Sequence, residues 1–593
     1  MIITKFREIS DNILFLIRKN YKILLITFFP LFLLLINRNW IFFENPYGGN
    51  VDSWVNTGYF INYENYYKMF GQLYYGDRVS WIFPGYFLNH IFSPLMADYI
   101  LHIIFFSLTL ISLFFIIKLT FDENTAFLIS LMMGSYTFFV REIGSNYVSG
   151  AVITYLLLTI FFITISAKST NWKLFLGAGG ACFASLIYAH MFAIVFVPFI
   201  IAYYIMANHH WKVDNSVIRF LYFIAGMGVI TIIYGAINVI LTGNWFFYSA
   251  QLNSLIYYSN LASSSTETTL SYIFRLDSLI LPEIFFVVCG ISLLILNYYK
   301  KDNKNIFSLF FSICYILIFI MFFLIDLRGN PVLGLAFYNC YLIPFIFLAM
   351  AYPVSLILNE IKGHLLNLFL ILSVFLFSLP LIIYNFIPFS SPIVKYTAIF
   401  AFGLCLFIIT LKSKLEKINF KKILLPAILV VLCATYIIFN CCLYTSNAYT
   451  DIDFHNIDSQ ENGYIAIMDS VGIINQGISI DKVRFWYNIN ETNENGYYGG
   501  LYGSINSVYL WMYTYISQDF PNIDKSKFET PFYWPQPPPK VVILSTDANA
   551  FQEAQDSLNA IGYNATFISE KTVKQGKIDF NITFINIAKN ESD

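Results

Sequence analysis

Long apolar runs constrain this chain more than any other feature of its sequence. Runs of 18 or more residues with few charges recur along the first three quarters of the 593 residues. Each run is long enough to cross about 30 Å of hydrocarbon as a helix. Hydrophobic residues make up 58% of the chain and charged residues only 12%, whereas a soluble protein carries about a quarter charged residues. The sequence therefore predicts a polytopic α-helical membrane protein, for which no nucleic-acid partner is expected.

About 13 membrane spans are predicted, and the distribution of positive charge orients them. They lie near residues 21–43, 98–118, 125–140, 150–167, 172–189, 191–207, 217–241, 278–299, 306–326, 333–358, 365–388, 391–411 and 423–445. With the N-terminus in the cytoplasm, nineteen lysines and arginines of the membrane part fall inside and seven outside. Since cytoplasmic loops carry the excess of Lys and Arg, this orientation is expected, in a cell membrane. The first run lacks a small-residue cleavage site and is not expected to be a signal peptide.

The seven basic residues predicted on the outer side are mostly arginines, whereas those predicted inside are mostly lysines. Five of these seven are arginines, in a set consisting of Arg38, Lys68, Arg78, Arg141, Arg275, Arg328 and Lys395. A guanidinium presents a planar fork of donors suited to phosphate oxygens. One interpretation is a phosphate-binding cluster on the outer face. The other is that these arginines extend from helix ends to water and pair with neighbouring carboxylates.

The composition changes after the last predicted span. Residues 446–593 carry 18 acids against 9 bases, and their apolar runs are short. From Lys540 onward the pattern predicts strand, helix and strand. We therefore predict a membrane domain over 1–445 and an extracytoplasmic α/β domain over 446–593. All eight cysteines lie within or at the ends of apolar runs, so neither a disulfide framework nor a Cys/His metal motif is indicated.

The first outer loop, residues 44–97, is too long to be only a connection. It contains the aromatic segments NYENYYKMFGQLYY and WIFPGYFLNHIF, which favour amphipathic helices in the outer interface. Asp52, in GGNVDSWVNTGYF, follows shortly after the first span, where a helix can direct it. A carboxylate at the membrane–water boundary suits a general base, but an Asp at this place also suits a helix N-cap before Ser53. Glu44 is a second acid in the same loop.

The stretch FVREIGSNYVSG, residues 139–150, is the second outward feature. Arg141 and Glu142 lie there close to membrane depth, where a charge is costly without a partner. They pair with each other or with Arg78 and Asp77 on one interpretation, and form part of a binding site on the other.

Taken together, these stretches resemble the GT-C class of multispanning glycosyltransferases, in particular the family-39-like branch with protein mannosyltransferases and aminoarabinose transferases. The resemblance covers roughly residues 20–345 and is one of layout. Its elements are Asp52 in a long first outer loop, the interface helices, and three stretches: DRVSWIFPGYF (77–87), LFLGAGGACFASLIYAHMFAIVFVPFIIAYY (174–204) and GNPVLGLAFYNCYLIPFIFLA (329–349).

The resemblance implies a polyprenyl-phosphate-linked sugar donor at the outer face and transfer with inversion to a glycan, lipid or protein acceptor. It implies that Asp52 is the catalytic base, and that Arg78, Arg141 and Arg328 hold the phosphate. Family members often carry a second acid where this chain has Ser149, so Glu142 and Glu44 are auxiliary candidates and a divalent metal stays an open question.

Two other classes of function remain. One is a transporter or flippase of lipid-linked saccharides, which would favour internal repeats and polar groups near the midplane. No repeat is evident, and the polar candidates gather at the outer ends of spans. The other is a non-catalytic membrane assembly protein, in which the aromatic loop and the acidic domain bind partners.

Overall fold

The chain divides into two compact units in the computed structural model. The structure describes residues 20–36, 50–70, 72–260, 305–328, 336–359, 363–383, 483–486, 540–545, 549–560, 562–575 and 578–589, with isolated positions between them. Unit 1 consists of Met1–Ile41, Asp77–Trp81 and Tyr99–Thr450, and unit 2 of Phe42–Gly76, Ile82–Asp98 and Asp451–Asp593. The division predicted at 445/446 stays a prediction.

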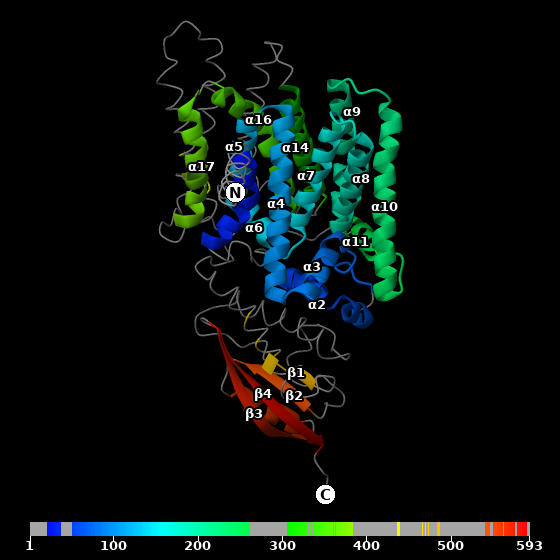
Figure 1. The fold of residues 1–593 in the computed structure, drawn as a ribbon. Helices are drawn as coiled ribbons and strands as arrows, with labels where there is room; N and C mark the ends of the chain where they lie inside the picture. Colours follow the sequence, from blue (N-terminus) through cyan, green and yellow to red (C-terminus); the bar gives the residue numbers. More distant parts are fainter. Residues whose placement is uncertain are drawn as a thin grey trace, which may run out of the picture. The chain divides into compact units, whose positions relative to one another are not determined.

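Unit 1 is helical, and its long helices run side by side (Figure 1). After the apolar helix Asn20–Ile36, its elements are α4 (Pro94–Thr120), α5 (Glu123–Ser135), α6 (Thr137–Gly144), α7 (Ser149–Ser166), α8 (Trp172–Ala189), η2 (Met191–Phe196), α9 (Val197–His210), α10 (Ser216–Thr242), α11 (Ser249–Asn260), α14 (Asn305–Asp326), α15 (Ala336–Asn339), η3 (Cys340–Leu342), α16 (Ile343–Leu358) and α17 (His364–Ile383). The first residues of α4 belong to unit 2.

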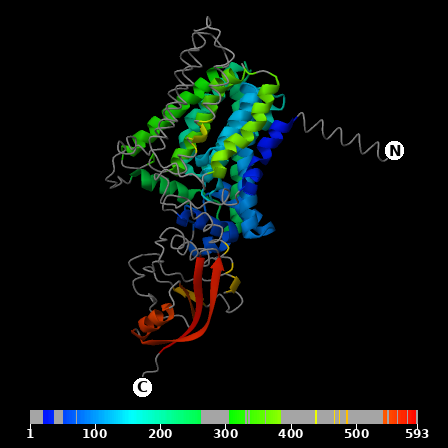
Figure 2. The ribbon, with the colours of Figure 1, turned by 90° about the vertical axis from the view of Figure 1, so that its left-hand side faces the viewer.

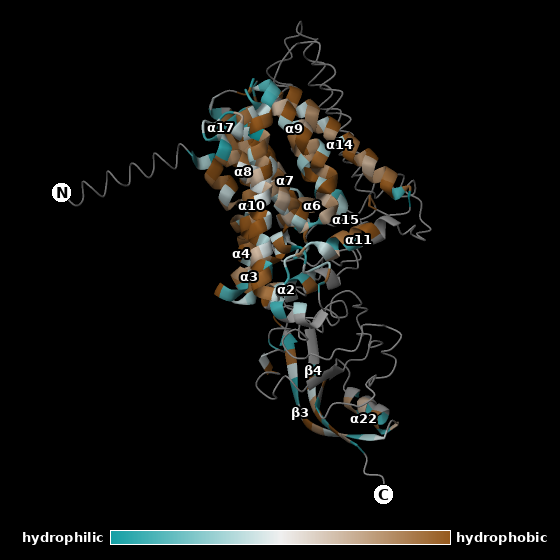
Figure 3. Cartoon of the chain, turned by 90° about the vertical axis from the view of Figure 1, so that its right-hand side faces the viewer, coloured by the Kyte–Doolittle hydropathy of each residue, from teal (hydrophilic) through white to brown (hydrophobic). Residues whose placement is uncertain are grey.

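Within the described residues, six helices are long and apolar enough to cross a membrane, or seven if the bent pair α5–α6 is one span. They are rich in hydrophobic residues along their length (Figure 3). On α10, large apolar side chains such as Val217 and Ile240 are 79% and 82% exposed, as side chains that face lipid require. Predicted spans 278–299 and 391–411, and most of 423–445, lie outside the described residues, so the number thirteen stays a prediction.

The predicted span 125–140 is broken in the structure. Helices α5 and α6 are bent by 67° at Tyr136, whose backbone is extended. The backbone groups freed by this break are satisfied from a distant segment of unit 1. Asn440 Oδ1 accepts the N–H of Thr137 (3.1 Å), and the Tyr436 hydroxyl donates to the carbonyl oxygen of Met132. Non-helical backbone inside a helix bundle needs such partners, because no water is there to replace them.

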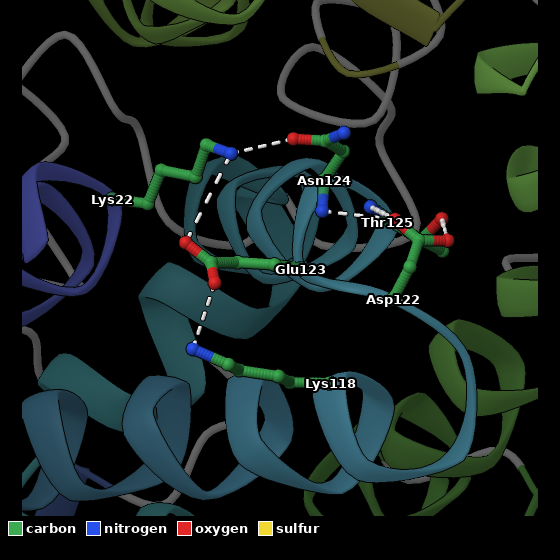
Figure 4. A network of polar contacts seen from close by, with 6 residues as sticks. All are labelled: Lys22, Lys118, Asp122, Glu123, Asn124 and Thr125. Atoms are coloured by element: carbon green, nitrogen blue, oxygen red, sulfur yellow. Dashed lines mark hydrogen bonds and ion pairs between the residues drawn. The ribbon is translucent and has the colours of Figure 1, made fainter. Parts of the chain in front are cut away.

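An ionic cluster marks the start of α5 (Figure 4). Asp122 caps the helix by accepting hydrogen bonds from two backbone N–H groups of the first turn, both at 2.9 Å. Glu123 pairs with Lys118 at the end of α4 (2.8 Å) and lies 3.9 Å from Lys22 on the first apolar helix. Three helices are thus joined at one end of the bundle, the end predicted to be cytoplasmic.

The long loop contains two helices, α2 (Asn50–Phe70) in unit 2 and α3 (Val79–Ile91), which belongs to unit 2 from Ile82 onward. The first aromatic segment, 62–75, is helical up to Phe70, and the second, 81–92, is helical up to Ile91. The two helices pack closely, because Gly85 lies where a Cβ atom would be 2.3 Å from the ring of Phe60. The Tyr86 hydroxyl donates to Glu64 Oε1 at 2.5 Å. This aromatic pair of helices is therefore fixed internally.

The later part of unit 2 contains a four-stranded sheet in the order β1-β2-β4-β3. Its elements are β1 (Val483–Trp486), β2 (Lys540–Ser545), α22 (Ala550–Ala560), β3 (Tyr563–Gln575) and β4 (Ile578–Lys589). Strands β3 and β4 form a long antiparallel hairpin (Figure 2), and β1 pairs with β2 in parallel. Leu558 of α22 packs with Ala565 and Ile585. Strand, helix and strand follow Lys540 in the expected order, while the domain 446–593 as a whole stays a prediction.

Helices α8 and α10 contact each other through glycines, which provides a test of the bundle. A Cβ atom on Gly180 would lie 1.8 Å from the carbonyl oxygen of Phe223. We expect Gly180→Ala to lower the free energy of unfolding by about 1–3 kcal/mol, since the helices must separate. Gly228→Ala, on α10 with nothing within 4 Å of its added methyl, is the control and should be neutral. Thermal unfolding in detergent measures both, and equal melting temperatures would contradict the packing described.

Candidate functional site

The short segment Asp77–Trp81, which includes the first three residues of α3, belongs to unit 1. Its first residue is fixed by hydrogen bonds. Asp77 Oδ2 accepts the backbone N–H groups of Ala250 (2.7 Å) and Gln251 (3.1 Å), both in the first turn of α11. A carboxylate at a helix N-terminus is favoured by the helix dipole. Asp77 thus caps a helix more than 170 residues later in the chain, and the two segments hold each other in place.

The end of the same segment is also held. The Ser80 hydroxyl donates to the carbonyl oxygen of Ser185 on α8 (2.6 Å), and the Tyr155 hydroxyl of α7 donates to the carbonyl oxygen of Ser80 (2.9 Å). Trp81 donates its indole N–H to the carbonyl oxygen of Asn146 (3.1 Å), in the turn between α6 and α7. Three elements therefore fix the backbone on the far side of Arg78.

Arg78 is completely buried between these two anchors. Its guanidinium carbon lies 5.1 Å from the ring centroid of Tyr147, within the range of a cation–π interaction. Tyr147 is itself buried in the α6–α7 turn. Arg78, predicted from the sequence to bind phosphate, is thus a buried arginine whose guanidinium lies against this turn. Its role in binding stays a prediction.

The other predicted pair lies on α6, which is buried throughout. Arg141 and Glu142 are 2% and 3% exposed. The Ser149 hydroxyl, on the first residue of α7, donates to Glu142 Oε2 at 2.7 Å. Gly150 permits this close approach, because a Cβ there would lie 3.0 Å from the Cα atom of Ile143. The structure therefore brings Glu142 to Ser149, the position at which the sequence lacks the expected acid.

His102 of α4 organises the backbone of the α6–α7 turn. Its buried ring lies between the carbonyl oxygen of Ile143 (2.9 Å from Nδ1) and the side-chain amide of Asn146 (2.6 Å from Nε2). The Asn146 atom in this contact is the side-chain oxygen Oδ1, so the ring connects the oxygen atoms of Ile143 and Asn146. The turn that receives Trp81 is thereby fixed from behind.

His190 joins the site from the break between α8 and η2. It has an extended backbone (φ −154°, ψ 113°) that ends α8, and its side chain is 3% exposed. The Tyr341 hydroxyl lies 3.1 Å from Nδ1, and the Tyr338 ring lies alongside. Burial, and secondly the charge of Arg78, hold the pKa of His190 well below its ordinary value of 6.5. The imidazole is therefore neutral at pH 7.

Arg328 differs from the other predicted arginines. It lies in the turn after α14 and is exposed. Its neighbour Asp326 is buried, and Oδ1 of Asp326 accepts the N–H groups of Val332 and Leu333 (3.0 Å to Leu333). Thus Asp326 holds Val332 and Leu333 close to the end of α14. Among the predicted arginines, Arg78 and Arg141 are buried and Arg328 is not.

The two acids predicted in the first outer loop are Asp52 and Glu44, and the structure does not test their place in the site. Asp52 is the third residue of α2 and belongs to unit 2, so the helix starts two residues before it and Asp52 is not its N-cap. Glu44 lies outside the described residues. Their roles stay predictions. In the part of the chain that the structure describes, no group of three or more His, Cys, Asp or Glu side chains could hold a metal ion.

Some residues of the site were not singled out from the sequence. His190 and Tyr341 lie within two of the stretches that carry the GT-C resemblance, and a buried polar residue between apolar runs was their available signal. Gln251 had no such signal. Its importance depends on contacts with residues 77, 188 and 191, which no local pattern predicts.

The comparisons with known proteins find two similar solved structures at low sequence identity. The chain matches no protein-family model and no curated protein. It is similar to the crystal structure of ArnT from Cupriavidus metallidurans in the apo state, with a TM-score of 0.44 and 11% identity over 89% of this chain and 93% of that one. For the same protein bound to undecaprenyl phosphate, the TM-score is 0.45 and the identity 10%, over 93% and 97%. At these values the similarity assigns no role to any residue here.

The lowered pKa of His190 predicts how stability depends on pH. Below about pH 6.5 the imidazole of the unfolded chain takes up a proton, while that of the folded chain resists it. The free energy of unfolding should therefore fall as the pH drops below that value, by up to about 1.4 kcal/mol per pH unit from this group. Melting curves between about pH 7.5 and 5 should show a smaller slope for His190→Asn than for wild type. Identical slopes would contradict the assignment.

Proposed function

We propose that this chain is an integral membrane glycosyltransferase. It moves a sugar from a polyprenyl-phosphate-linked donor to an acceptor glycan, lipid or protein at the outer membrane face. The N-terminus lies in the cytoplasm and the domain 446–593 lies outside, where it contributes to recognition of the acceptor. The anomeric carbon of the sugar is inverted.

The main support is the pair of buried arginines around one end of α7. Arg78 comes from the connection before α3, and Arg141 comes from α6. Both lie against or next to the turn that leads into α7. Together the two guanidinium groups place positive charge in a buried position beside this turn. A phosphate is a suitable partner, because it accepts bidentate hydrogen bonds.

The same charges have a use during the reaction. The bond between the anomeric carbon and the phosphate oxygen breaks as the acceptor oxygen attacks from the opposite face. Its electron pair remains on the polyprenyl phosphate. Positive groups that are already in place stabilise this developing charge without reorganisation. Because His190 is neutral, the cluster owes its positive charge to the arginines.

Glu142 is the auxiliary acid on this proposal. Its Oε2 accepts from Ser149, while Oε1 is buried without a hydrogen-bond partner among the described residues. The positive charge of Arg141 and the thiol of Cys340 also face this carboxylate. A sugar hydroxyl that donates to Oε1 would satisfy the remaining acceptor. Metal dependence is left to measurement, by adding a chelator to the transfer assay.

Asp52 is the proposed general base, which takes the proton of the acceptor hydroxyl as the new glycosidic bond forms. We expect Asp52→Asn to reduce transfer by about 10²- to 10⁴-fold, with an unchanged melting temperature. The assay follows radiolabelled sugar from a pool of polyprenyl-phosphate sugars with purified protein in lipid. Equal transfer by wild type and Asp52→Asn would remove Asp52 from the mechanism.

The two buried arginines and the exposed one provide a matched comparison. Replacement of Arg78 or Arg141 by Gln should weaken binding of undecaprenyl phosphate about tenfold or more, since one charge-assisted hydrogen bond contributes about 1.5–3 kcal/mol. Arg328→Gln, at an exposed position, should have a smaller effect. Titration of detergent-solubilised protein, followed by tryptophan fluorescence, measures all three. If Arg328→Gln had the largest effect, the phosphate site would lie at the α14 turn instead.

One observation favours the second candidate, a transporter or flippase of lipid-linked saccharides. The α5–α6 pair is bent by 67°, and discontinuous helices are common at transporter binding sites. Proteoliposomes that contain a fluorescent polyprenyl-phosphate sugar distinguish the two functions. Movement of the lipid between leaflets without chemical transfer would favour the transporter.

A further inference from the structure

Gln251 is a buried glutamine that links two separate segments of backbone. It is 1% exposed, on the first turns of α11. Its Nε2 donates to the carbonyl oxygens of Asp77 (2.7 Å) and Tyr188 (3.3 Å), and its Oε1 accepts the N–H of Met191 (3.0 Å). One side-chain amide thus satisfies three backbone groups from two parts of the chain.

These backbone groups adjoin the residues of the candidate site. Asp77 directly precedes Arg78, while Tyr188 and Met191 lie on the two sides of His190. The bond from Asp77 Oδ2 to the backbone N–H of Gln251 (3.1 Å) closes the arrangement from the other direction. A single side chain therefore fixes the backbone at Arg78 relative to the backbone at His190.

Neither segment has regular secondary structure of its own to provide this fixation. Arg78 lies in the connection before α3, and His190 lies at the break between α8 and η2. Backbone N–H and C=O groups at such places find no partner in a helix and must be satisfied by side chains when they are buried. Gln251 has both the donor and the acceptor that this task requires.

We infer that Gln251 is a positioning residue, which holds the backbone at Arg78 against the backbone around His190, so that Arg78 is in place to receive the phosphate of the lipid-linked donor. It acts through the backbone and does not itself touch the phosphate. The inference rests on the function proposed above, and it adds α11 to the elements that build the site.

Two substitutions separate the roles of the donor and the acceptor. Gln251→Met keeps the length of the side chain and removes both. Gln251→Glu keeps acceptors only, while the carboxyl is ionised, and places a second negative charge near Asp77. Once protonated, that carboxyl again has one donor and one acceptor. Of the titratable groups, Asp77 is hydrogen-bonded to the backbone of Gln251, and Tyr188 and His190 belong to the segment whose backbone Gln251 binds; Arg78 directly follows Asp77.

The experiment uses full-length protein in detergent and two readouts. Hydrogen exchange of peptides that contain Met191 reports the clamp, by which we mean the three side-chain hydrogen bonds of Gln251 to backbone. Titration with undecaprenyl phosphate reports binding at the site. Thr164→Val is the matched control. It removes a buried hydrogen bond to the Tyr203 hydroxyl (2.7 Å) near the other end of α7, about 22 Å along the helix from Ser149 at 1.5 Å per residue.

For Gln251→Met we expect about tenfold faster exchange at Met191 and about tenfold weaker binding. Gln251→Glu should bind weakly at about pH 8 and recover as the pH falls toward about 5.5. That recovery should be absent from wild type and from Thr164→Val. A general loss of stability would not produce it.

Three outcomes would overturn the inference. If Gln251→Met exchanges and binds like wild type, Gln251 is no clamp, and the proposed function is untouched. If exchange accelerates while binding stays the same, the clamp exists but does not position the site. If wild type binds no undecaprenyl phosphate, the proposed function fails and the inference fails with it, whatever the exchange rates are.

Discussion

The burial of two guanidinium groups at one end of a helix bundle is the constraint on which the rest of this site depends. A buried charge is tolerated only where its surroundings are fixed and its hydrogen bonds are directed. The chain meets this requirement by holding the backbone on both sides of Arg78. Asp77 is tied to α11, Ser80 to α7 and α8, and Trp81 to the α6–α7 turn. The backbone of Arg78 is therefore held in place on both sides by its neighbours.

The broken helix α5–α6 is the second requirement of the same site. A continuous helix over 125–140 would have carried Arg141 further along the same axis as α5. The 67° bend instead leads α6 into the turn that contains Tyr147 and accepts the indole N–H of Trp81, and it brings Glu142 to Ser149. The bend is stabilised by Asn440 and Tyr436, from far later in the sequence. Helix geometry alone thus does not explain the site, because hydrogen bonds from Asn440 and Tyr436 are needed to stabilise the break.

Prediction from sequence succeeded where the signal is local and repeated. The span 172–189 coincides with α8, and 217–241 and 306–326 agree with α10 and α14 to within a residue. Apolar length decides such elements, since a helix that crosses the membrane must satisfy its own backbone. The span predicted over 125–140 consists of two helices with a bend between them. The bend was not predicted, because the extended residue at 136 depends on tertiary hydrogen bonds. Likewise the sequence could single out Arg78 and Arg141 by their charge and predicted side of the membrane, but it could not show that they are buried while Arg328 is exposed.

By itself the sequence determined the membrane-protein class and the order of strand, helix and strand after Lys540. These follow from hydropathy, charge and periodicity, which neighbouring residues express together. Tertiary structure alone decided that Glu142 meets Ser149, that His190 lies buried near Arg78, and that Gln251 links the segments of both. Such contacts join residues from 7 to 174 positions apart. Their geometry is fixed by packing between helices, which no local pattern of residues encodes.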